Sequence, residues 1–560
     1  MNDLIKILLI ILSIIISSRS YSLEIPVYTG SEKTYMPVSA ISGYFGKEDG
    51  ILISWFEESN NGCIKIQKLD ENGVVMWTEN GVILETELGN EFLEETDYPF
   101  LFSDNKGGAL MIYRKRYFER EDIMAKRILF NGSVEKDPVR ISSGIPGFNF
   151  SPSAIKTYDD RIAVVWENFS GGDFNIEGQL LDLQGNKIWA NGNPVQICNF
   201  RDEQRKPVVT CDENNKLLIT WLDTRKHSEY VFDVYGRILD LYAPDFNYNP
   251  FGTLIFKNAI TDNSRKLTMY DLNNAPIDKS SFLIVFENSY DNLFNDIRAI
   301  KIDNNLEKEW EIIIDSESDK IKPFIARIDN NRAGFFWNDI GDDHNEIYGI
   351  IAGKDGNILW GDKNGKKISY NESKEITEKV LPLSANRNNS LFKDDMLYQT
   401  WSVKDSKKLF VSSLHLSDGS IPFNSSEEIQ EKISGGEFAS ISALKNNLMI
   451  VYKVSDYIYA ASKDMNKQGI TNNAEIPVLK NYPNPFNPAT KIDFNIPADG
   501  FVRLSVFDIS GRLVKELING YQTKGDYQIG FNGSNLSSGV YLYKLEVAGK
   551  ILVSKMTLLK

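Results

Sequence analysis

The sequence of 560 residues contains only three cysteines and three histidines. Cys63, Cys198 and Cys211 do not have the spacing of metal ligands, which argues against a structural zinc site. Cys198 and Cys211 are close enough in the sequence to form one disulfide, which would leave Cys63 unpaired; the alternative is three buried thiols in strands. The histidines lie in different parts of the chain with no ligand spacing among them. We therefore expect no metal site and no cofactor.

Positive charge and long apolar segments are also scarce. Lysine and arginine number 62 against 77 aspartates and glutamates, and the resulting formal net charge of −15 argues against a nucleic-acid-binding protein. The apolar run Ile7–Ile16 is too short for a spanning helix, which needs about 20 residues. Lys6 precedes this run and Ser20-Tyr21-Ser22 follows it, so residues 1–22 are predicted to be a cleaved secretory signal peptide. A retained anchor is the alternative. We expect an exported protein that is not an integral membrane protein.

Sequence motifs of catalysis are absent as well. The chain has no nucleophile elbow, no His-Glu-x-x-His sequence and no phosphate-binding or dinucleotide-binding glycine loop. A carboxylate pair of the glycosidase type depends on a separation in space, which a sequence does not give. No catalytic residue is therefore predicted.

What the sequence does contain is a repeat of about 55 residues. A short apolar run ends on an aromatic residue, and a polar loop, a second strand, a turn glycine and a short last strand follow. Four short strands per repeat, stacked radially, predict a β-propeller. Eight blades are favoured, and seven are the alternative because the fifth, seventh and eighth repeats are the most degenerate. The recurring aromatic residues are Trp55, Tyr113, Trp166, Trp221, Phe286, Trp337, Trp401 and Tyr452.

Two details of this repeat predict contacts. Glu24–Tyr28 has the pattern of a last strand but precedes the first repeat, so we expect it to complete the final blade and close the ring. A small residue recurs in the strand after each polar loop, as at Gly178 and Gly236. Such a residue admits a large neighbour, and we expect the repeated aromatic residue of an adjacent strand or module to lie against it, as Trp166 against Gly178. The Asp-box turn of sialidase-type propellers has only a distant counterpart in Ser103–Gly107.

The composition changes after Asn472. Asn481–Pro488 contains three prolines in eight residues, and X-Pro steps disfavour a helix. Alternating strands with turn glycines follow, which predicts a small immunoglobulin-like β-sandwich. The predicted organisation is all-β: a signal peptide (1–22), a β-propeller (23–470), a linker with the Asn-Tyr-Pro-Asn-Pro-Phe-Asn-Pro motif (471–488) and a C-terminal sandwich (489–560).

Three motifs of this last region resemble the type A C-terminal sorting domain of the type IX secretion system. The resemblance implies export by the Sec translocon, passage across the outer membrane by the type IX machinery, and cleavage by its sortase-like peptidase. The protein is then expected in the medium or on the outer cell surface. The residues that carry the motifs are Asn481, Tyr482, Pro483, Asn484, Pro485, Phe486, Asn487, Pro488, Gly511, Gly539 and Tyr541.

The polar loops that follow the repeated aromatic residues are expected to gather on one face of the propeller. Aromatic side chains mixed with arginine and aspartate can stack on sugar rings or anchor a protein. The alternative is that aspartate and asparagine only build turns there. The candidate binding residues are Phe169, Asp223, Arg225, Tyr230, Tyr290, Phe294 and Asp339.

These observations favour a non-catalytic binding or adhesion module for polysaccharide or protein. The alternative is a secreted glycan-acting enzyme, a glycoside hydrolase or lyase, with an unidentified carboxylate site. A structural spacer in a larger assembly is a third possibility.

Overall fold

The structure is a computed structural model in which the chain divides into two compact units, one within residues 22–466 and the other in the C-terminal part from residue 467. The described residues are 23–44, 47–59, 62–71, 73–88, 99–135, 137–143, 147–225, 232–258, 271–289, 295–315, 318–341, 345–368, 380–381, 390–393, 396–403, 409–415, 427–428, 436–445, 447–454, 456–464, 479–496, 500–509, 512–523, 525–547 and 550–560.

The larger unit consists of short antiparallel sheets that follow one another along the chain. The first modules contain β2 (Thr34–Tyr44), β3 (Lys47–Glu57), β4 (Cys63–Asp70) and β5 (Val82–Glu85); β6 (Phe100–Ser103), β7 (Ala109–Tyr117), β8 (Arg120–Ile128) and β9 (Val139–Arg140); and β10 (Phe148–Lys156), β11 (Arg161–Ser170), β12 (Asp173–Asp182) and β13 (Val195–Cys198), with the 3-10 helix η3 (Trp189–Gly192) before β13.

The later modules continue this pattern. They contain β14 (Gln204–Cys211), β15 (Lys216–Asp223), β16 (Asp233–Asp240) and β17 (Thr253–Phe256); β18 (Leu272–Pro276), β19 (Ser281–Ser289), β20 (Asn295–Asp303) and β21 (Lys308–Ile314); β22 (Asp319–Arg327), β23 (Arg332–Ile340), β24 (Asn345–Gly353), β25 (Ile358–Trp360) and β26 (Lys366–Lys367); β27 (Val380–Leu381), β28 (Ser390–Lys393), β29 (Met396–Val403), β30 (Leu409–His415) and β31 (Glu427–Glu428); and β32 (Gly436–Leu444), β33 (Asn447–Val454) and β34 (Tyr457–Asp464).

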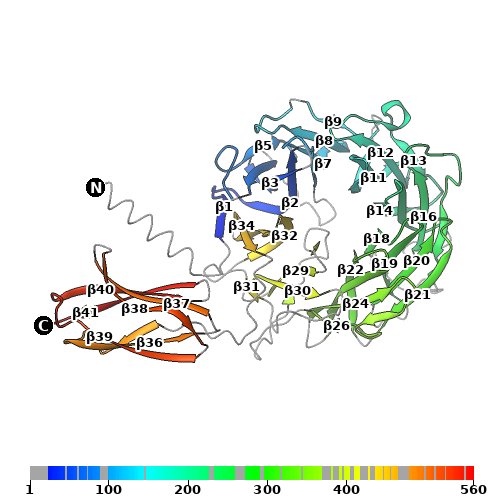
Figure 1. Ribbon diagram of the computed structural model, residues 1–560. Helices are drawn as coiled ribbons and strands as arrows, with labels where there is room; N and C mark the ends of the chain where they lie inside the picture. Colours follow the sequence, from blue (N-terminus) through cyan, green and yellow to red (C-terminus); the bar gives the residue numbers. More distant parts are fainter. Residues whose placement is uncertain are drawn as a thin grey trace. The chain divides into compact units, whose positions relative to one another are not determined.

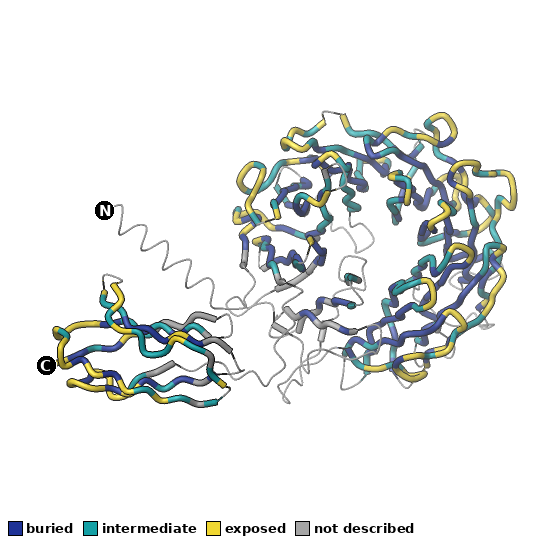
Figure 2. The backbone as a smooth tube through the Cα atoms, in the orientation of Figure 1, coloured by how far each residue is buried: buried dark blue, intermediate teal, exposed yellow. Residues whose placement is uncertain are grey.

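These modules are arranged in a ring, as Figure 1 shows. The first strands lie innermost: β2 contacts β6 and β32, and β14 contacts β10 and β18. The strand centres are buried, whereas the turns at the outer rim are exposed (Figure 2). The prediction of an all-β chain with an N-terminal β-propeller is therefore confirmed. The number of blades and the domain boundaries stay predictions.

The ring closes through its N-terminal strand. β1 (Leu23–Tyr28) pairs antiparallel with β34, with Ile25 opposite Ala460. Ile25, Val27 and Tyr28 are buried in one core with residues of β3 and β33. The predicted closure by residues 24–28 is thus confirmed. β34 is thereby paired on both sides, with β33 and with β1, and does not form an unpaired edge.

The repeated aromatic residues form the centre of the cores. Trp55, Trp166, Trp221 and Trp337 are fully buried. Because β-branched and aromatic side chains fill a half-buried pleated surface well, the runs that end on them form the second strand of each module.

Within one repeat, the expected contact between the aromatic residue and the small residue is wrong in its register. Gly178 pairs with Val165, and Trp166 pairs with Glu177. Adjacent residues of a strand point to opposite faces, so the small residue and the aromatic residue lie on different faces of the sheet. The glycine that admits the tryptophan is instead the one before the fourth strand. A Cβ at Gly81 would lie 2.5 Å from the Trp55 ring, and a Cβ at Gly365 would lie 2.3 Å from the Trp337 ring.

Neighbouring modules are also joined at their outer turns. The indole Nε1 of Trp77 donates to the carbonyl of Phe130 in the next module (3.1 Å), and Trp310 donates to Lys354 in the same way (2.9 Å). The turn glycines beneath these rings, Gly132 and Gly356, have φ values of +81° and +84°. A side chain at either position would lie too close to the tryptophan ring. It would also be strained, because the left-handed backbone conformation disfavours any residue other than glycine.

The cysteines are buried and free. The alternative of buried thiols is therefore the correct one, and the proposed Cys198–Cys211 disulfide is not formed. Burial raises the pKa of Cys198 to about 11 and that of Cys211 to about 12, which disfavours their reactive thiolate forms.

The C-terminal unit contains two antiparallel sheets. One contains β35 (Leu479–Tyr482), β36 (Ala489–Ile496) and β39 (Gly525–Asn532). The other contains β37 (Gly500–Asp508), β38 (Leu513–Gln522), β40 (Gly539–Val547) and β41 (Lys550–Leu558). Side chains of both sheets share one buried core around Phe486, Phe494 and Leu504. This is the predicted β-sandwich.

Candidate functional site

The candidate site lies where the second strand of each module turns into the third. These strand ends carry the polar loops singled out in the sequence. Tyr230, Tyr290, Phe294 and the sorting-motif residue Gly511 lie outside the described residues, as do residues 1–22. Phe169, Asp223, Arg225 and Asp339 are described, and they come from three different modules.

Asp223 and Arg225 form a buried ion pair. The Asp223 carboxylate is fully buried and accepts a hydrogen bond from Trp221 Nε1 at 2.9 Å. Arg225 donates to it at 2.6 Å, and its guanidinium stacks on the rings of Tyr235 (4.0 Å) and Phe200 (4.3 Å). This carboxylate raises the pKa of Arg225, although burial acts against it. In this arrangement, the pair fixes the strand end of β15 and leaves the carboxylate closed to solvent.

Asp339 is held in a similar way. It is 5% exposed and accepts from Ser318 Oγ at 2.6 Å and from Trp337 Nε1 at 3.4 Å. The ammonium group of Lys320, fully buried, lies 3.6 Å from it. Burial lowers the pKa of Lys320, and the Asp339 charge partly offsets this effect. Asp339 therefore stabilises a buried cation, and its role as a ligand contact stays a prediction.

Phe169 belongs to a group of four phenylalanines and three arginines, which we call the arginine–phenylalanine face. The Phe169 and Phe174 rings are 4.8 Å apart, and Phe150 lies 5.9 Å from Phe174. Arg205 stacks 3.8 Å above Phe174, and Arg114 lies 5.7 Å from Phe150. The members of the face are Arg114, Arg116, Phe148, Phe150, Phe169, Phe174 and Arg205.

Strand pairing brings these residues together. β8 and β10 join two modules into one sheet through the parallel pair Phe148 and Glu121. The tight turn Gly171-Gly172, with positive φ at both residues, returns the chain so that Phe174 pairs with Phe169. Below the arginines lie buried carboxylates: Arg205 pairs with Glu167 at 2.9 Å, and Arg116 with Glu121 at 2.8 Å. Phe148, at the edge, is 37% exposed.

Of the arginine–phenylalanine face, sequence reasoning identified Phe169 as a candidate but missed Phe148, Phe150, Phe174 and Arg205. The alternation Phe148-Asn-Phe150 at the start of a strand was a signal that both rings lie on one side of a sheet. No pattern in the sequence indicates that Arg205, from the following module, reaches the same surface.

Two buried glutamates each accept a hydrogen bond from the first strand of the module that follows their own. Glu167 follows Trp166 and accepts from the backbone N–H of Lys206, and Glu287 follows Phe286 and accepts from the backbone N–H of Lys322. Both lysines precede a proline and have positive φ at a bulge in the first strand. Burial, and then the charge of Asp271, raise the pKa of Glu287 to about 8.

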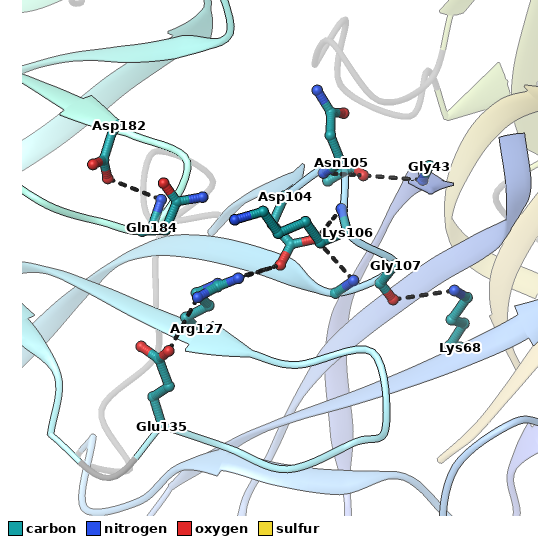
Figure 3. A network of polar contacts seen from close by, with 12 residues as sticks. Gly43, Lys68, Asp104, Asn105, Lys106, Gly107, Arg127, Glu135, Asp182 and Gln184 are labelled. Carbon is teal, nitrogen blue, oxygen red and sulfur yellow. Dashed lines mark hydrogen bonds and ion pairs between the residues drawn. The ribbon is translucent and has the colours of Figure 1, made fainter. Parts of the chain in front are cut away.

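The distant counterpart of an Asp box is a structural turn at the opposite end of the modules. Asp104 is 1% exposed and accepts from the backbone N–H groups of Lys106 (2.8 Å) and Gly108 (2.9 Å) and from Arg127 (2.9 Å). Figure 3 shows this network, in which Lys68 of the preceding module also donates to the Gly107 carbonyl. Here the simple turn-building role of aspartate holds.

Within the described ranges, no group of three or more histidine, cysteine or acidic side chains is placed to hold a metal ion. Over the same part of the chain, no helix has the length and apolar character needed to cross a membrane.

The Asn481–Pro488 motif of the C-terminal unit is bonded to the last strand, β41. Asn484 donates to the Lys555 carbonyl (3.1 Å) and accepts from the Thr557 N–H (2.9 Å), so it bonds two residues of β41. Phe486 is 1% exposed, and its backbone bonds to Thr557 and Leu559. Tyr543 donates to Asn481, and Tyr541 donates to the Ser537 carbonyl. The polar and aromatic residues of the motif thus fasten the two sheets together.

Residues 480–558 match the family of secretion system C-terminal sorting domains. This confirms the resemblance to the type IX sorting domain. The domain directs the protein to the cell surface or the medium, and this localisation is the one expected from the sequence.

Solved structures resemble the chain in fold only. A mutant puromycin hydrolase complexed with PGG is 8% identical with a TM-score of 0.43; the match covers 84% of this chain and 59% of that protein, so this chain spans less than two thirds of it. A polysaccharide lyase PL25, an ulvan lyase, is 11% identical with a TM-score of 0.41, covering 78% of this chain and 96% of the lyase. The β-propeller domain of the Trilobed protease from Pyrococcus furiosus is 9% identical with a TM-score of 0.36. The match covers 70% of this chain and 98% of that domain. No curated protein matches the sequence.

Proposed function

We propose that the propeller is a non-catalytic binding module, delivered to the cell surface or the medium by its sorting domain. The observation that supports this most is the arginine–phenylalanine face. Its carboxylates are buried and paired with arginines, so they form part of the scaffold, while the phenylalanine and arginine side chains remain partly exposed. Aromatic rings and arginines are the residues that dominate binding surfaces, because they bury a large area and make directed hydrogen bonds.

The proposal is tested by a binding screen with the full-length mature chain against polysaccharides and surface proteins. For any ligand found, Phe148→Ala is expected to weaken binding about tenfold, since an anchoring aromatic side chain contributes about 1–2 kcal/mol. Phe130→Ala is the matched control, because Phe130 is 64% exposed in an outer turn at the opposite end of the modules. Absence of any ligand, or equal effects of both variants, would contradict the proposal.

A second candidate is a glycan-acting enzyme, and one observation favours it. Glu287, with its pKa raised to about 8, holds a proton at neutral pH, which is the state that a general acid requires. Turnover of a polysaccharide by the mature chain, lost in Glu287→Gln with the fold retained, would favour this candidate over a binding module.

A further inference from the structure

Cations contact three buried carboxylates at the β7–β8 hairpin, with Glu121 on one face of the sheet and with Asp122 and Glu85 on the other. Glu85, Glu121 and Asp122 are each 7% exposed or less. Each carboxylate is shared by two cations: Glu121 by Arg114 and Arg116, Asp122 by Arg120 and Arg140, and Glu85 by Lys115 and Lys126. Six cations on three carboxylates leave three positive charges, of which Glu119 in the turn offsets one. The hairpin as a whole, over both faces, is therefore positively charged, on a chain of net charge −15.

The arginines of this hairpin are more exposed to solvent than the carboxylates that they contact. The side chains of Arg116, Arg120 and Arg140 are 32–38% exposed, whereas the carboxylates that they contact lie beneath them. A ligand that approaches this area therefore meets guanidinium groups before it meets their partners. The buried carboxylates orient the arginines, and this lowers the conformational entropy that a ligand would otherwise have to remove.

Aromatic rings lie among the exposed arginines. Arg120 stacks over Tyr117 at 4.4 Å, and Phe118, at the tip of the β7–β8 turn, is 99% exposed. On the other side of the hairpin, Phe148 pairs with Glu121, which links this area to the arginine–phenylalanine face. Cations and flat apolar surfaces thus alternate along the edge made by β7, β8 and β10.

We propose that this edge binds an anionic polysaccharide, with arginines on its carboxylate or sulfate groups and rings on the apolar faces of its sugars. Guanidinium groups match planar and tetrahedral oxyanions with paired hydrogen bonds. A charged sugar chain carries both a repeated anion and a repeated apolar face, which is the alternation that the edge presents. The inference rests on the proposed binding function and gives its ligand class.

The test measures binding of the full-length mature chain to dextran sulfate and to polygalacturonate, with neutral dextran and poly-glutamate as comparisons. We expect one or both anionic polysaccharides to bind, dextran not to bind, and the affinity to fall at least tenfold between 50 and 200 mM salt, because the contacts are ionic and screened by salt. Arg116→Gln/Arg120→Gln is expected to weaken binding at least tenfold, and Phe118→Ala several-fold.

Two features keep this experiment decisive. Arg332→Gln is the matched control, since Arg332 is also partly exposed and paired with an aspartate but lies at the start of β23, in a different module. This variant should bind as the wild type does. Phe118→Ala removes a fully exposed side chain and so leaves the fold intact. Equal binding of dextran, tighter binding of poly-glutamate, or full binding by the double variant would overturn the inference. If the broader screen finds another ligand while these probes fail, the inference fails alone; if both find nothing, the binding function fails as well.

Discussion

At the scale of single residues, the same position carries different chemistry in the third and the fifth module. Glu167 and Glu287 each follow the core aromatic residue and each accept a backbone N–H from the next module. Glu167 has the guanidinium of Arg205 at 2.9 Å. Glu287 is buried near Asp271, and its pKa is raised to about 8. Burial of a carboxylate without a strong cation favours its protonated form.

Glu287 should therefore make stability depend on pH. Its pKa of about 8 in the folded protein exceeds the value of 4.5 in the unfolded chain, so the folded state binds the additional proton between these values. The free energy of unfolding is expected to fall as pH rises from about 4.5 to 8 and to lose this dependence above 8. Glu287→Gln, which keeps an acceptor for Lys322, should raise the melting temperature at pH 8 and change it little at pH 5.

The paired position supplies the control for this measurement. Glu167→Gln removes the charge that Arg205 contacts, so it is expected to destabilise the protein by about 2 kcal/mol at pH 8, opposite in sign to the effect at Glu287. Thermal denaturation of both variants at pH 5, 6.5 and 8 separates the two cases. A melting temperature of Glu287→Gln that follows the wild type at every pH would contradict the assigned proton.

At the scale of elements, the strand that decides the integrity of the ring is the first one. β1 adds to β34, although more than 400 residues separate them in the sequence. Ile25 fills the space above Gly73, where an added Cβ would lie 2.2 Å from its Cδ1 atom, so β1 contacts the first module as well as the last. One short strand thus joins both ends of the ring.

Shortening this side chain should loosen the closure. Ile25→Ala is expected to lower the free energy of unfolding by about 3 kcal/mol, because it leaves a cavity in a core shared by both ends of the ring. Pro26→Ala is the matched control: Pro26 is its exposed neighbour in the same strand, and a change of less than about 0.5 kcal/mol is expected. Urea denaturation measures both. Equal values for the two variants would show that β1 does not contribute to the closure.

At the scale of the whole molecule, the two units have separate tasks. The C-terminal unit matches a sorting family, and its motif is built into its own two sheets through Asn484 and Phe486. The propeller presents partly exposed arginine and phenylalanine side chains at the loop end of its modules. Under the proposed function, export and recognition therefore depend on different surfaces.

Removal of residues 477–560 should consequently stop export without removing the propeller. We expect the truncated chain to accumulate in the periplasm, whereas the full-length chain reaches the surface or the medium. Immunoblotting of cell fractions and medium measures this, with the full-length chain expressed in parallel as the control. Normal delivery of the truncated chain would contradict the role assigned to the sorting domain.

The sequence by itself determined the class of fold, the repeat and the sorting domain. Each depends on local patterns: apolar runs ending at Trp55 or Trp166, turn glycines such as Gly185 with its positive φ, and the Asn481–Pro488 motif. Strand closure by residues 24–28 was also predictable, since the segment has the pattern of a last strand and a ring needs one there.

Only the tertiary structure decided the register, the pairing of charges and the composition of the candidate site. A shift of one residue in the strand register moves every side chain to the other face of a sheet. The register in the structure places Gly178 opposite Val165 and not opposite Trp166. Asp223, a candidate binding residue in the sequence, is closed off by Trp221 and Arg225, and Arg205 joins Phe174 from a different module. These contacts connect residues through space, and local patterns carry no information about which distant side chain will fill the space beside them.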